Sequence, residues 1–430
     1  MRIVVALPYA PWPVTKGTDR LILNLLDGLA ARHDVTLVAM ALTKDDLARL
    51  REIERPRVTV RAIVAPNKRS LLRRIYHKGA NNARAWFAGI PAQVSYAAPP
   101  ELLRLIADTA NGWDADLVLA SYWHLYRLPG LVKRSKLALV THDLDFLVNP
   151  ARLRSMDGKA RAAAARRLGA LERIERTAYG RYDTILTVTP SDAETLARHP
   201  AAEGKEVRAL PLALDLRAFN PGAHERERNR ILFMGTFHSD FNRDAFRFLA
   251  GEIFPIVRSR NPEARLEIVG HGVDEGLRAA AGPGVSFAGG VEDIRPHLGA
   301  CSAMVLPLRF CGGVRIRMME AAAMGTPVVS TPVGVAGMGL EAGTDYIEGQ
   351  TAAEIALGLL HLLRDGGEAR RIGANARRWA EANISMESYP ARLDALFEWM
   401  FARSGGAAPR GEARGGGPAS PENADRREKV

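Results

Sequence analysis

Short apolar runs alternate along this chain with longer amphipathic stretches. The short runs are rich in β-branched residues and nearly free of polar alternation, which predicts strands that are buried on both faces. The longer stretches, such as residues 18–32 and 101–111, predict helices between these strands. Strands and helices that alternate in this way favour a parallel, doubly wound sheet. In the first half of the chain we expect strands at residues 2–7, 35–41, 58–64, 117–120, 137–141 and 184–188.

The same pattern then starts again. A polar run at residues 224–230 resembles an interdomain linker and precedes a second set of strands, expected at residues 231–234, 266–269, 285–288, 303–306 and 328–330. Two Rossmann-like domains that face a central cleft are the simplest α/β architecture, with ligands beyond the carboxyl ends of the strands. We assign residues 1–210 to the first domain, 211–385 to the second, 386–402 to a helix that packs back on the first, and 403–430 to a disordered tail rich in Gly, Pro and charge.

The composition fits two domains but does not select a function. The 430 residues are 47% hydrophobic and 25% charged, as in globular proteins. The net charge of +11 suggests an anionic partner (nucleic acid, membrane surface or phosphorylated ligand), although it also serves solubility.

No stretch reaches the roughly 20 apolar residues of a membrane span, so we expect any membrane contact to be peripheral. Cys301 and Cys311 form no CxxC pair, which argues against a zinc site or disulfide framework and favours the cytoplasm.

The segment at residues 303–338 carries the strongest chemical signal. Its first strand is followed by Gly312 and Gly313, and then by a helix expected at residues 314–324. We expect Gly325 to end this helix in a left-handed conformation. A glycine pair ahead of a helix frees backbone N–H groups to face an anion, so this loop is a candidate phosphate site.

Two arginines and a glutamate in this helix extend the argument. Arg315 and Arg317 are unfavourable near the positive end of a helix, unless a bound diphosphate reverses the sign of the interaction. Glu320 shares a helix face with Arg317 and could accept hydrogen bonds from ribose hydroxyls. The alternative is a surface helix with an ordinary Arg317–Glu320 pair, but a second glycine loop at residues 334–339 favours the binding site.

With these features the chain resembles glycosyltransferase family 4, a group of retaining enzymes with the GT-B fold. The resemblance runs from Met1 to about Ser385 and is closest to bacterial members of surface-polysaccharide pathways. MRIVVALPYAPWPVTKGTDRLILNLLDGLAARHDVTLVAM is similar to the family's opening strand, glycine loop and first helix. ILFMGTFHSDFNRDAFRFLAGEIFPIVRSRNPEARLEIVGHG is similar to the opening of its C-terminal half, and residues 303–338 to its donor-binding motif. The resemblance implies transfer of a hexose-type sugar from a nucleotide diphosphate sugar with retention of configuration.

The resemblance also implies roles for particular residues. Glu320 matches the glutamate that holds the donor ribose, and Gly17 matches the glycine loop that approaches the donor diphosphate and the acceptor. His142 matches a histidine near the transferred sugar, and the alternative is a hydrogen-bonded histidine at a strand end. The loop whose backbone amides face the diphosphate and sugar corresponds to Val335, Ala336, Gly337 and Met338. We assign the acceptor side to Thr18, Asp143 and Asp145.

The chain departs from the family pattern in two places. The family motif has two glutamates separated by seven residues, and Glu320 matches the second. The first is missing, because this chain has Gly312 eight positions before Glu320, so the motif does not define how the donor sugar hydroxyls are held. Many members also carry an Arg and a Lys after the first strand of the second domain. In this chain the corresponding loop lacks the Arg, and Arg243 is the candidate substitute for the Lys. We also assign Thr236, in the same loop, to the donor site. Arg315 and Arg317 would then supply the phosphate charge. His271, at the end of another strand, is a further donor-site candidate for which a structural role is equally open.

We expect the transfer to need no metal and no other cofactor. Charge develops on the leaving diphosphate, and glycine-loop amides, helix N-termini and arginines can stabilise it. No Asp-x-Asp cluster has a convincing metal setting, since the pattern of Asp143 and Asp145 follows a strand but shares its loop with His142.

Two basic stretches bear on the acceptor. Residues 61–90 contain seven Lys and Arg residues and no acidic residue, interleaved with apolar ones, and residues 152–181 are also Arg-rich. This pattern is typical of peripheral contact with an anionic membrane, or of two solvated helices in a basic protein. The membrane interpretation predicts a lipid-linked or other glycan acceptor at the inner face of the plasma membrane, whereas a soluble acceptor fits the alternative.

Two rival functions remain open at this stage. A nucleotide-sugar epimerase of the same fold would act without an acceptor, and an inactive glycan- or nucleic-acid-binding scaffold would not turn over a donor. No nucleic-acid recognition motif is present, so we expect no nucleic-acid partner. Residues 9–13 do not form a GxGxxG turn, which disfavours a nicotinamide enzyme.

Overall fold

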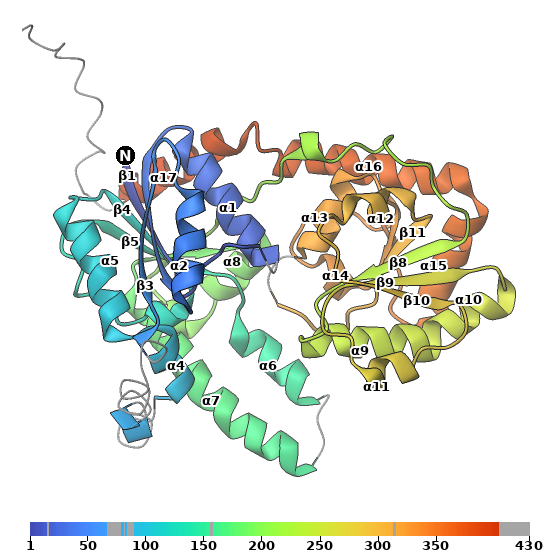
Figure 1. Ribbon diagram of the computed structural model, residues 1–430, viewed down its shortest axis with the longest axis horizontal. Helices are drawn as coiled ribbons and strands as arrows, with labels where there is room; N and C mark the ends of the chain where they lie inside the picture. Colours follow the sequence, from blue (N-terminus) through green and yellow to red (C-terminus); the bar gives the residue numbers. More distant parts are fainter. Residues whose placement is uncertain are drawn as a thin grey trace, which may run out of the picture.

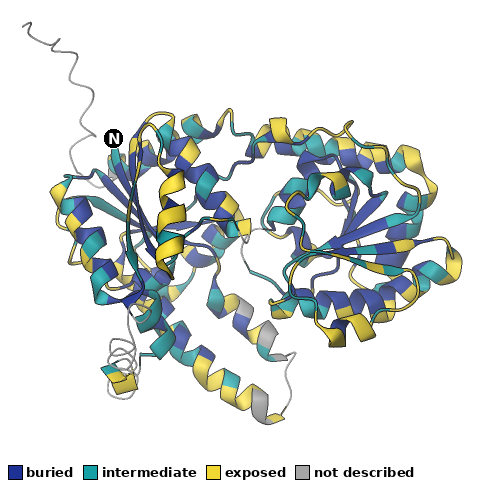
Figure 2. Cartoon of the chain, viewed as in Figure 1, coloured by how far each residue is buried: buried dark blue, intermediate teal, exposed yellow. Residues whose placement is uncertain are grey.

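The chain folds into two α/β domains, each built on a parallel sheet with helices on both faces (Figure 1). The sequence pattern predicts this arrangement of two α/β domains, and the resemblance to glycosyltransferase family 4 implies its GT-B form. A computed structural model describes residues 1–14, 17–66, 79–80, 82–83, 90–154, 158–312 and 315–403. Within these residues the central strands of both sheets are mostly buried and the edge strands are partly exposed, while other exposed positions gather on the outer faces of the helices (Figure 2). Apolar runs without alternation therefore form the buried strands, as expected.

The N-terminal domain contains a seven-stranded sheet in the order β3-β2-β1-β4-β5-β6-β7. Its strands are β1 (Arg2–Ala6), β2 (Asp34–Ala41), β3 (Val58–Val64), β4 (Leu117–Ser121), β5 (Lys136–Thr141), β6 (Thr184–Thr187) and β7 (Glu206–Ala209). Its main helices are α1 (Gly17–Ala30), α2 (Lys44–Leu50), α4 (Ala92–Ala97), α5 (Pro100–Gly112), α6 (Asp145–Arg154), α7 (Gly158–Arg181) and α8 (Pro190–Ala197). The strand order reverses between β1 and β4, where a doubly wound sheet opens a crevice for ligands.

The C-terminal domain contains a six-stranded sheet in the order β10-β9-β8-β11-β12-β13, which reverses between β8 and β11. Its strands are β8 (Arg230–Met234), β9 (Arg265–Val269), β10 (Val285–Gly289), β11 (Ala303–Leu306), β12 (Val328–Ser330) and β13 (Ile347–Glu348). Its helices are α9 (Asp240–Phe248), α10 (Phe254–Arg260), α11 (Glu275–Ala279), α12 (Arg295–Ala300), α13 (Ile316–Ala323), α14 (Pro332–Val335), α15 (Ala352–Arg364) and α16 (Gly366–Ile384), followed by α17 (Tyr389–Arg403).

The polar run at residues 224–230 is part of the C-terminal domain, so its interpretation as a linker is wrong. Arg226 donates to the backbone oxygens of Cys301 at 2.8 Å and of Gly325 at 2.7 Å. The backbone N–H of Glu227 donates to the oxygen of Ala300 at 2.7 Å. These contacts hold a hydrophilic segment against the C-terminal ends of α12 and α13, whose backbone oxygens need donors.

The chain crosses between the domains twice, and the two crossings lie against each other. The backbone N–H of Leu214 donates to the backbone oxygen of Ile384 at 2.7 Å, and the backbone N–H of Met386 donates to the backbone oxygen of Leu214 at 3.2 Å. Helix α17 then lies on the N-terminal domain, where Phe397 joins the core cluster of β1 and α1. Each apolar side chain buried there contributes about 1.5–3 kcal/mol.

Candidate active site

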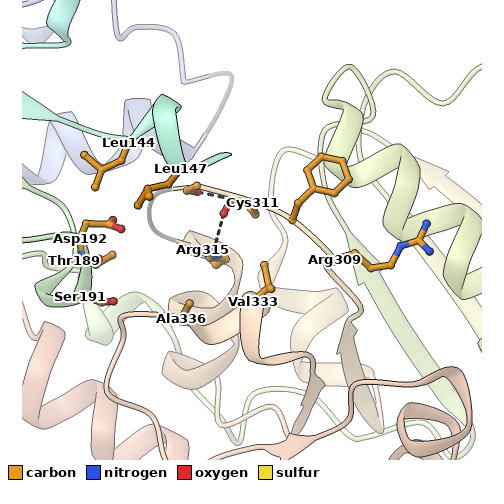
Figure 3. A pocket seen from close by; sticks show the side chains of 12 residues that line it. Leu144, Leu147, Thr189, Ser191, Asp192, Arg309, Cys311, Arg315, Val333 and Ala336 are labelled. Atoms are coloured by element: carbon orange, nitrogen blue, oxygen red, sulfur yellow. Dashed lines mark hydrogen bonds between the residues drawn. The ribbon is translucent and has the colours of Figure 1, made fainter. Parts of the chain in front are cut away.

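A cavity of about 230 Å³ opens between the two domains (Figure 3). It lies beyond the carboxyl ends of the strands, where ligands of doubly wound sheets bind. The N-terminal domain contributes the starts of α6 and α8, and the C-terminal domain contributes the loops after β11 and β12. The lining residues are Leu144, Leu147, Thr189, Ser191 and Asp192 on one side and Arg309, Phe310, Cys311, Gly312, Arg315, Val333 and Ala336 on the other.

Helix α13 begins at Ile316, two residues later than predicted. Arg315 is its N-cap residue, with φ −92° and ψ 83°, and its backbone oxygen accepts the N–H of Met318 at 2.8 Å. The Arg315 side chain is 6% exposed and donates to the backbone oxygen of Cys311 at 3.2 Å. Arg315 therefore lies ahead of the helix, on the cavity wall, while Gly313 lies outside the described residues.

Arg317 and Arg315 occupy different environments. The Arg317 guanidinium donates to the backbone oxygen of Met234 at 2.6 Å and to Oδ1 of Asn242 at 2.7 Å. It fills the space beside Gly235, where a Cβ would lie 3.0 Å from Nη1 of Arg317. Burial lowers the pKa of this guanidinium. Arg317 thus holds the loop after β8 against α13, and of these two arginines it is Arg315 that lines the cavity.

Glu320 lies one turn into α13 and faces the other domain. Burial raises the pKa of its carboxyl group to about 7, while the positive charges of Arg20, on α1, and of Arg317 act in the opposite direction. A carboxyl group at this position can accept hydrogen bonds from hydroxyl groups that enter between the domains. The helix prediction placed Glu320 on the same face as Arg317, and the mutual charge interaction agrees with that.

Two glycines allow the domains to approach closely. A Cβ on Gly17 would lie 2.5 Å from Cδ1 and 3.2 Å from Cβ of Ile316, so the N-terminal ends of α1 and α13 meet there. Gly337 has φ +75°, and a Cβ on it would lie 2.7 Å from Oγ1 of Thr189. Val335, Ala336 and Met338 flank this second contact, with Ala336 on the cavity wall.

His142 follows β5 and is 8% exposed. Its ring packs on Tyr122 with 4.4 Å between the ring centroids. Tyr122 has φ 74°, a strained conformation for a residue with a side chain, and strain of this kind clusters at functional sites. The Tyr122 hydroxyl lies 3.3 Å from that of Tyr9 and hydrogen-bonds Thr18, and burial raises the pKa of Tyr122 to about 12. Our sequence reasoning missed both tyrosines, although each follows a strand that borders the reversal in strand order.

Asp143 and Asp145 have different environments. Asp143 reaches solvent in the cleft, yet partial desolvation, followed by the charge of Asp145, raises its pKa to about 6. Asp145 accepts the indole N–H of Trp123 at 2.9 Å. The backbone N–H groups of Asp145 and Phe146 donate to Glu175, which is fully buried. Asp145 therefore positions Trp123 and the start of α6, whereas Asp143 is available to a ligand.

The remaining candidates lie in the C-terminal domain, away from the cavity lining. Arg243 donates to Asp274 at 2.6 Å, across the loops that follow β8 and β9. The backbone oxygen of Thr236 accepts Nδ2 of Asn242 at 2.8 Å. His271 is exposed at the end of β9. The structure therefore gives Arg243 a local partner and leaves a donor role for these three residues a prediction.

The expected basic surface is described only in part. Residues 67–78, 81 and 84–89 lie outside the described residues. The second basic stretch forms the last three residues of α6 and all of α7, where Arg161, Arg166 and Arg173 are exposed. None of the helices in the described ranges is long and apolar enough to cross a membrane. The same ranges contain no cluster of three or more His, Cys, Asp or Glu side chains suited to a metal ion.

Two family models match the chain. Residues 16–213 match "Glycosyl transferase 4-like domain" and residues 228–365 match "Glycosyl transferases group 1". A D-inositol 3-phosphate glycosyltransferase of Arthrobacter sp. (strain FB24) is 26% identical over 236 residues, which is 49% of this chain and 56% of that protein. The chain thus spans about half the length of the curated relatives it matches.

Solved structures share the fold over nearly the whole chain. Sucrose-phosphate synthase from Thermosynechococcus elongatus has a TM-score of 0.72 and 17% identity, and covers 94% of this chain and 99% of its own. Alr3699/HepE from Anabaena in complex with UDP-glucose has a TM-score of 0.63 and 13% identity, with 93% and 100% covered. At these identities the likeness establishes the arrangement of the two domains, and the arrangement is that of the GT-B fold.

Proposed function

The chain belongs to the glycosyltransferases of the GT-B fold, and from this premise we propose that it transfers a hexose-type sugar from a nucleoside diphosphate sugar to an acceptor. The acceptor is a glycan or a lipid-linked glycan of the cell surface. The transfer retains the anomeric configuration and needs no metal. One observation supports this proposal most directly. The N-terminal ends of α1 and α13 are in contact through Gly17 and Ile316, and Arg315 and Glu320 lie close to Ile316 in the sequence of α13 and its N-cap.

A diphosphate fits this junction for electrostatic reasons. Helix N-termini carry partial positive charge and unpaired N–H groups, and anions bind there. Arg315 adds a full positive charge on the same wall. The Glu320 carboxyl group is placed to accept hydrogen bonds from the ribose hydroxyls, which orients the nucleoside along the C-terminal domain.

In the proposed reaction the bond between the anomeric carbon and the diphosphate oxygen breaks. The oxygen of an acceptor hydroxyl forms the new bond on the same face of the sugar, and the hydroxyl proton passes to the departing diphosphate oxygen. Negative charge grows on the departing diphosphate, and groups fixed in place beforehand stabilise it without reorganisation. Arg315 and the start of α13 supply that stabilisation. His142 contacts the transferred sugar from the N-terminal domain, and Asp143 faces the acceptor.

The exposed arginines of α7 support a peripheral contact with an anionic membrane, which suits a lipid-linked acceptor. Part of this charge is locally paired, since Arg176 donates to Glu172 at 2.6 Å. The acceptor would then reach the N-terminal domain from the membrane surface.

A thermal-shift panel tests the donor site. UDP, GDP, ADP and their hexose forms, without metal, are added to the native protein and to Glu320→Ala. We expect one nucleotide series to raise Tm, because a ligand that binds only the folded state stabilises it. Glu320→Ala is expected to weaken that binding about 10- to 100-fold, the effect of losing hydrogen bonds to a charged group. A well-folded native protein that responds to no nucleotide would contradict the proposal. Product formed only in the presence of an acceptor separates a transferase from an epimerase.

The affinity for the nucleoside diphosphate is also expected to depend on pH. Ribose hydroxyls donate to the ionised carboxylate, and the pKa of Glu320 is raised to about 7. Binding should therefore be strongest above about pH 8 and weaken as the pH falls through 7, by up to about tenfold per unit. The phosphates titrate in a similar range, so the measurement is the difference between the native protein and Glu320→Gln in calorimetric titrations from pH 5.5 to 8.5. Parallel curves for the two proteins would exclude this role of Glu320.

A further inference from the structure

The interdomain cavity has two unlike walls. Gly312 contributes backbone and no side chain to the C-terminal wall, next to Arg315. On the opposite wall Asp192 lies at the start of α8 (Figure 3). Among the described residues that line the cavity, Asp192 is the one that carries a carboxylate. Two apolar side chains, Leu144 and Leu147, and the hydroxyl-bearing Thr189 and Ser191 complete the N-terminal wall.

The local sequence holds Asp192 in place. Thr189 is the N-cap of α8, and its Oγ1 accepts the backbone N–H of Asp192 at 3.0 Å. Pro190 occupies the first helical position, where its fixed φ suits the helix. Asp192 therefore sits in the first turn on a rigid backbone, with its carboxyl group directed toward the cavity (Figure 3). Burial raises the pKa of Asp192, while the charge of Arg315 across the cavity lowers it and favours the ionised form.

The size and polarity of the cavity indicate one kind of occupant. Its volume of about 230 Å³ is below the roughly 300–1,000 Å³ of pockets that enclose drug-sized ligands, so it suits a single sugar ring. A pyranose presents hydroxyl groups at its edge and C–H groups on its faces. An ionised carboxylate can accept hydrogen bonds from two such hydroxyls, and leucine side chains can pack against a face.

We propose that Asp192 binds hydroxyl groups of the transferred hexose and so determines which donor sugar is accepted. It supplies from the N-terminal domain a carboxylate that the C-terminal wall lacks at Gly312. Because Asp192 and Arg315 lie on opposite walls, the sugar is held between the domains, and its binding favours their closed arrangement. This inference rests on the proposed transferase function.

The test compares binding of the nucleotide with and without its sugar. The probes are UDP with UDP-glucose, GDP with GDP-mannose, and ADP with ADP-glucose, titrated calorimetrically into the native protein and into Asp192→Asn and Asp192→Ala. For the pair that the native protein binds, both variants should keep the nucleoside diphosphate affinity within about threefold. The affinity for the sugar form should fall about 10- to 100-fold, as for a lost charged hydrogen bond.

The matched control is Glu194→Gln. Glu194 lies on the same helix, its side chain is 70% exposed, and it pairs with Arg198 at 3.8 Å. This variant should bind both probes as the native protein does. Asp192→Asn keeps the shape of the side chain, so it separates loss of charge from a failure to fold. If the Asp192 variants bind the nucleoside diphosphate and its sugar form equally more weakly, or bind both as the native protein does, the proposed role of Asp192 is overturned and the proposed transferase function is not. A folded native protein that binds no probe would overturn the proposed function as well.

Discussion

Arg315→Ala is expected to lower kcat of the proposed transfer by about 100- to 1,000-fold, the effect of removing one fixed group that stabilises developing charge. Arg315 lies on the cavity wall, whereas Arg317 donates hydrogen bonds to Met234 and Asn242. The other arginine of the wall, Arg309, pairs with Asp244. Arg315→Lys should retain part of the activity, because an ammonium keeps the charge but loses the planar, forked geometry of the guanidinium. Steady-state rates with the donor identified by the thermal-shift panel provide the measurement.

A surface arginine supplies the control for this experiment. Arg371 lies on α16, exposed and paired with Glu368 at 2.7 Å, and Arg371→Ala should leave the rate unchanged. Tm is recorded for every variant, because Arg315 is buried and its loss leaves Asp143 and Asp192 with less compensating charge. If Arg315→Ala folds and retains more than about one third of the native kcat, Arg315 is not the group that stabilises the leaving diphosphate.

Gly17→Val is expected to reduce kcat/KM by about 100-fold or more while the N-terminal domain stays folded. A Cβ at residue 17 would already lie 3.2 Å from Cβ of Ile316, and the two methyl groups of valine need more room. The ends of α1 and α13 must then separate, which displaces the two halves of the site. A displacement of about 1 Å can cost about 100-fold in rate.

A second substitution distinguishes this steric effect from others. The double variant Gly17→Val with Ile316→Ala reopens the space, so it should recover much of the lost activity, and a double-mutant cycle measures the coupling. Gly169→Ala on α7 is the control, because a Cβ there meets nothing within 4 Å. If Ile316→Ala gives no recovery, the close approach at Gly17 is not what the reaction requires.

The alternation of apolar runs and amphipathic stretches predicted the two parallel sheets, including one edge strand of each, β3 and β10, but it missed the opposite edge strands, β7 and β13. Strand β7 contains Glu206 and Arg208, and β13 has only two residues, Ile347 and Glu348. An edge strand exposes polar positions and needs no continuous apolar run, so its signal is weak. The left-handed conformation of Gly325, by contrast, is confirmed at φ +63°, since a helix end requires it locally.

Within the site, the sequence by itself determined the local features. The β-branched runs formed buried strands, and Gly312, Arg315 and Glu320 were recognisable because they cluster around the start of one helix. The tertiary structure decided what each side chain contacts. Arg317 donates hydrogen bonds to Met234 and Asn242, more than 70 residues away in sequence, whereas Arg315 lines the cavity. Tyr9 met Tyr122, and Asp192 came to face Gly312, only through the packing of strands and domains. Local propensities act between near neighbours, whereas these contacts depend on how two separate sheets are placed against each other.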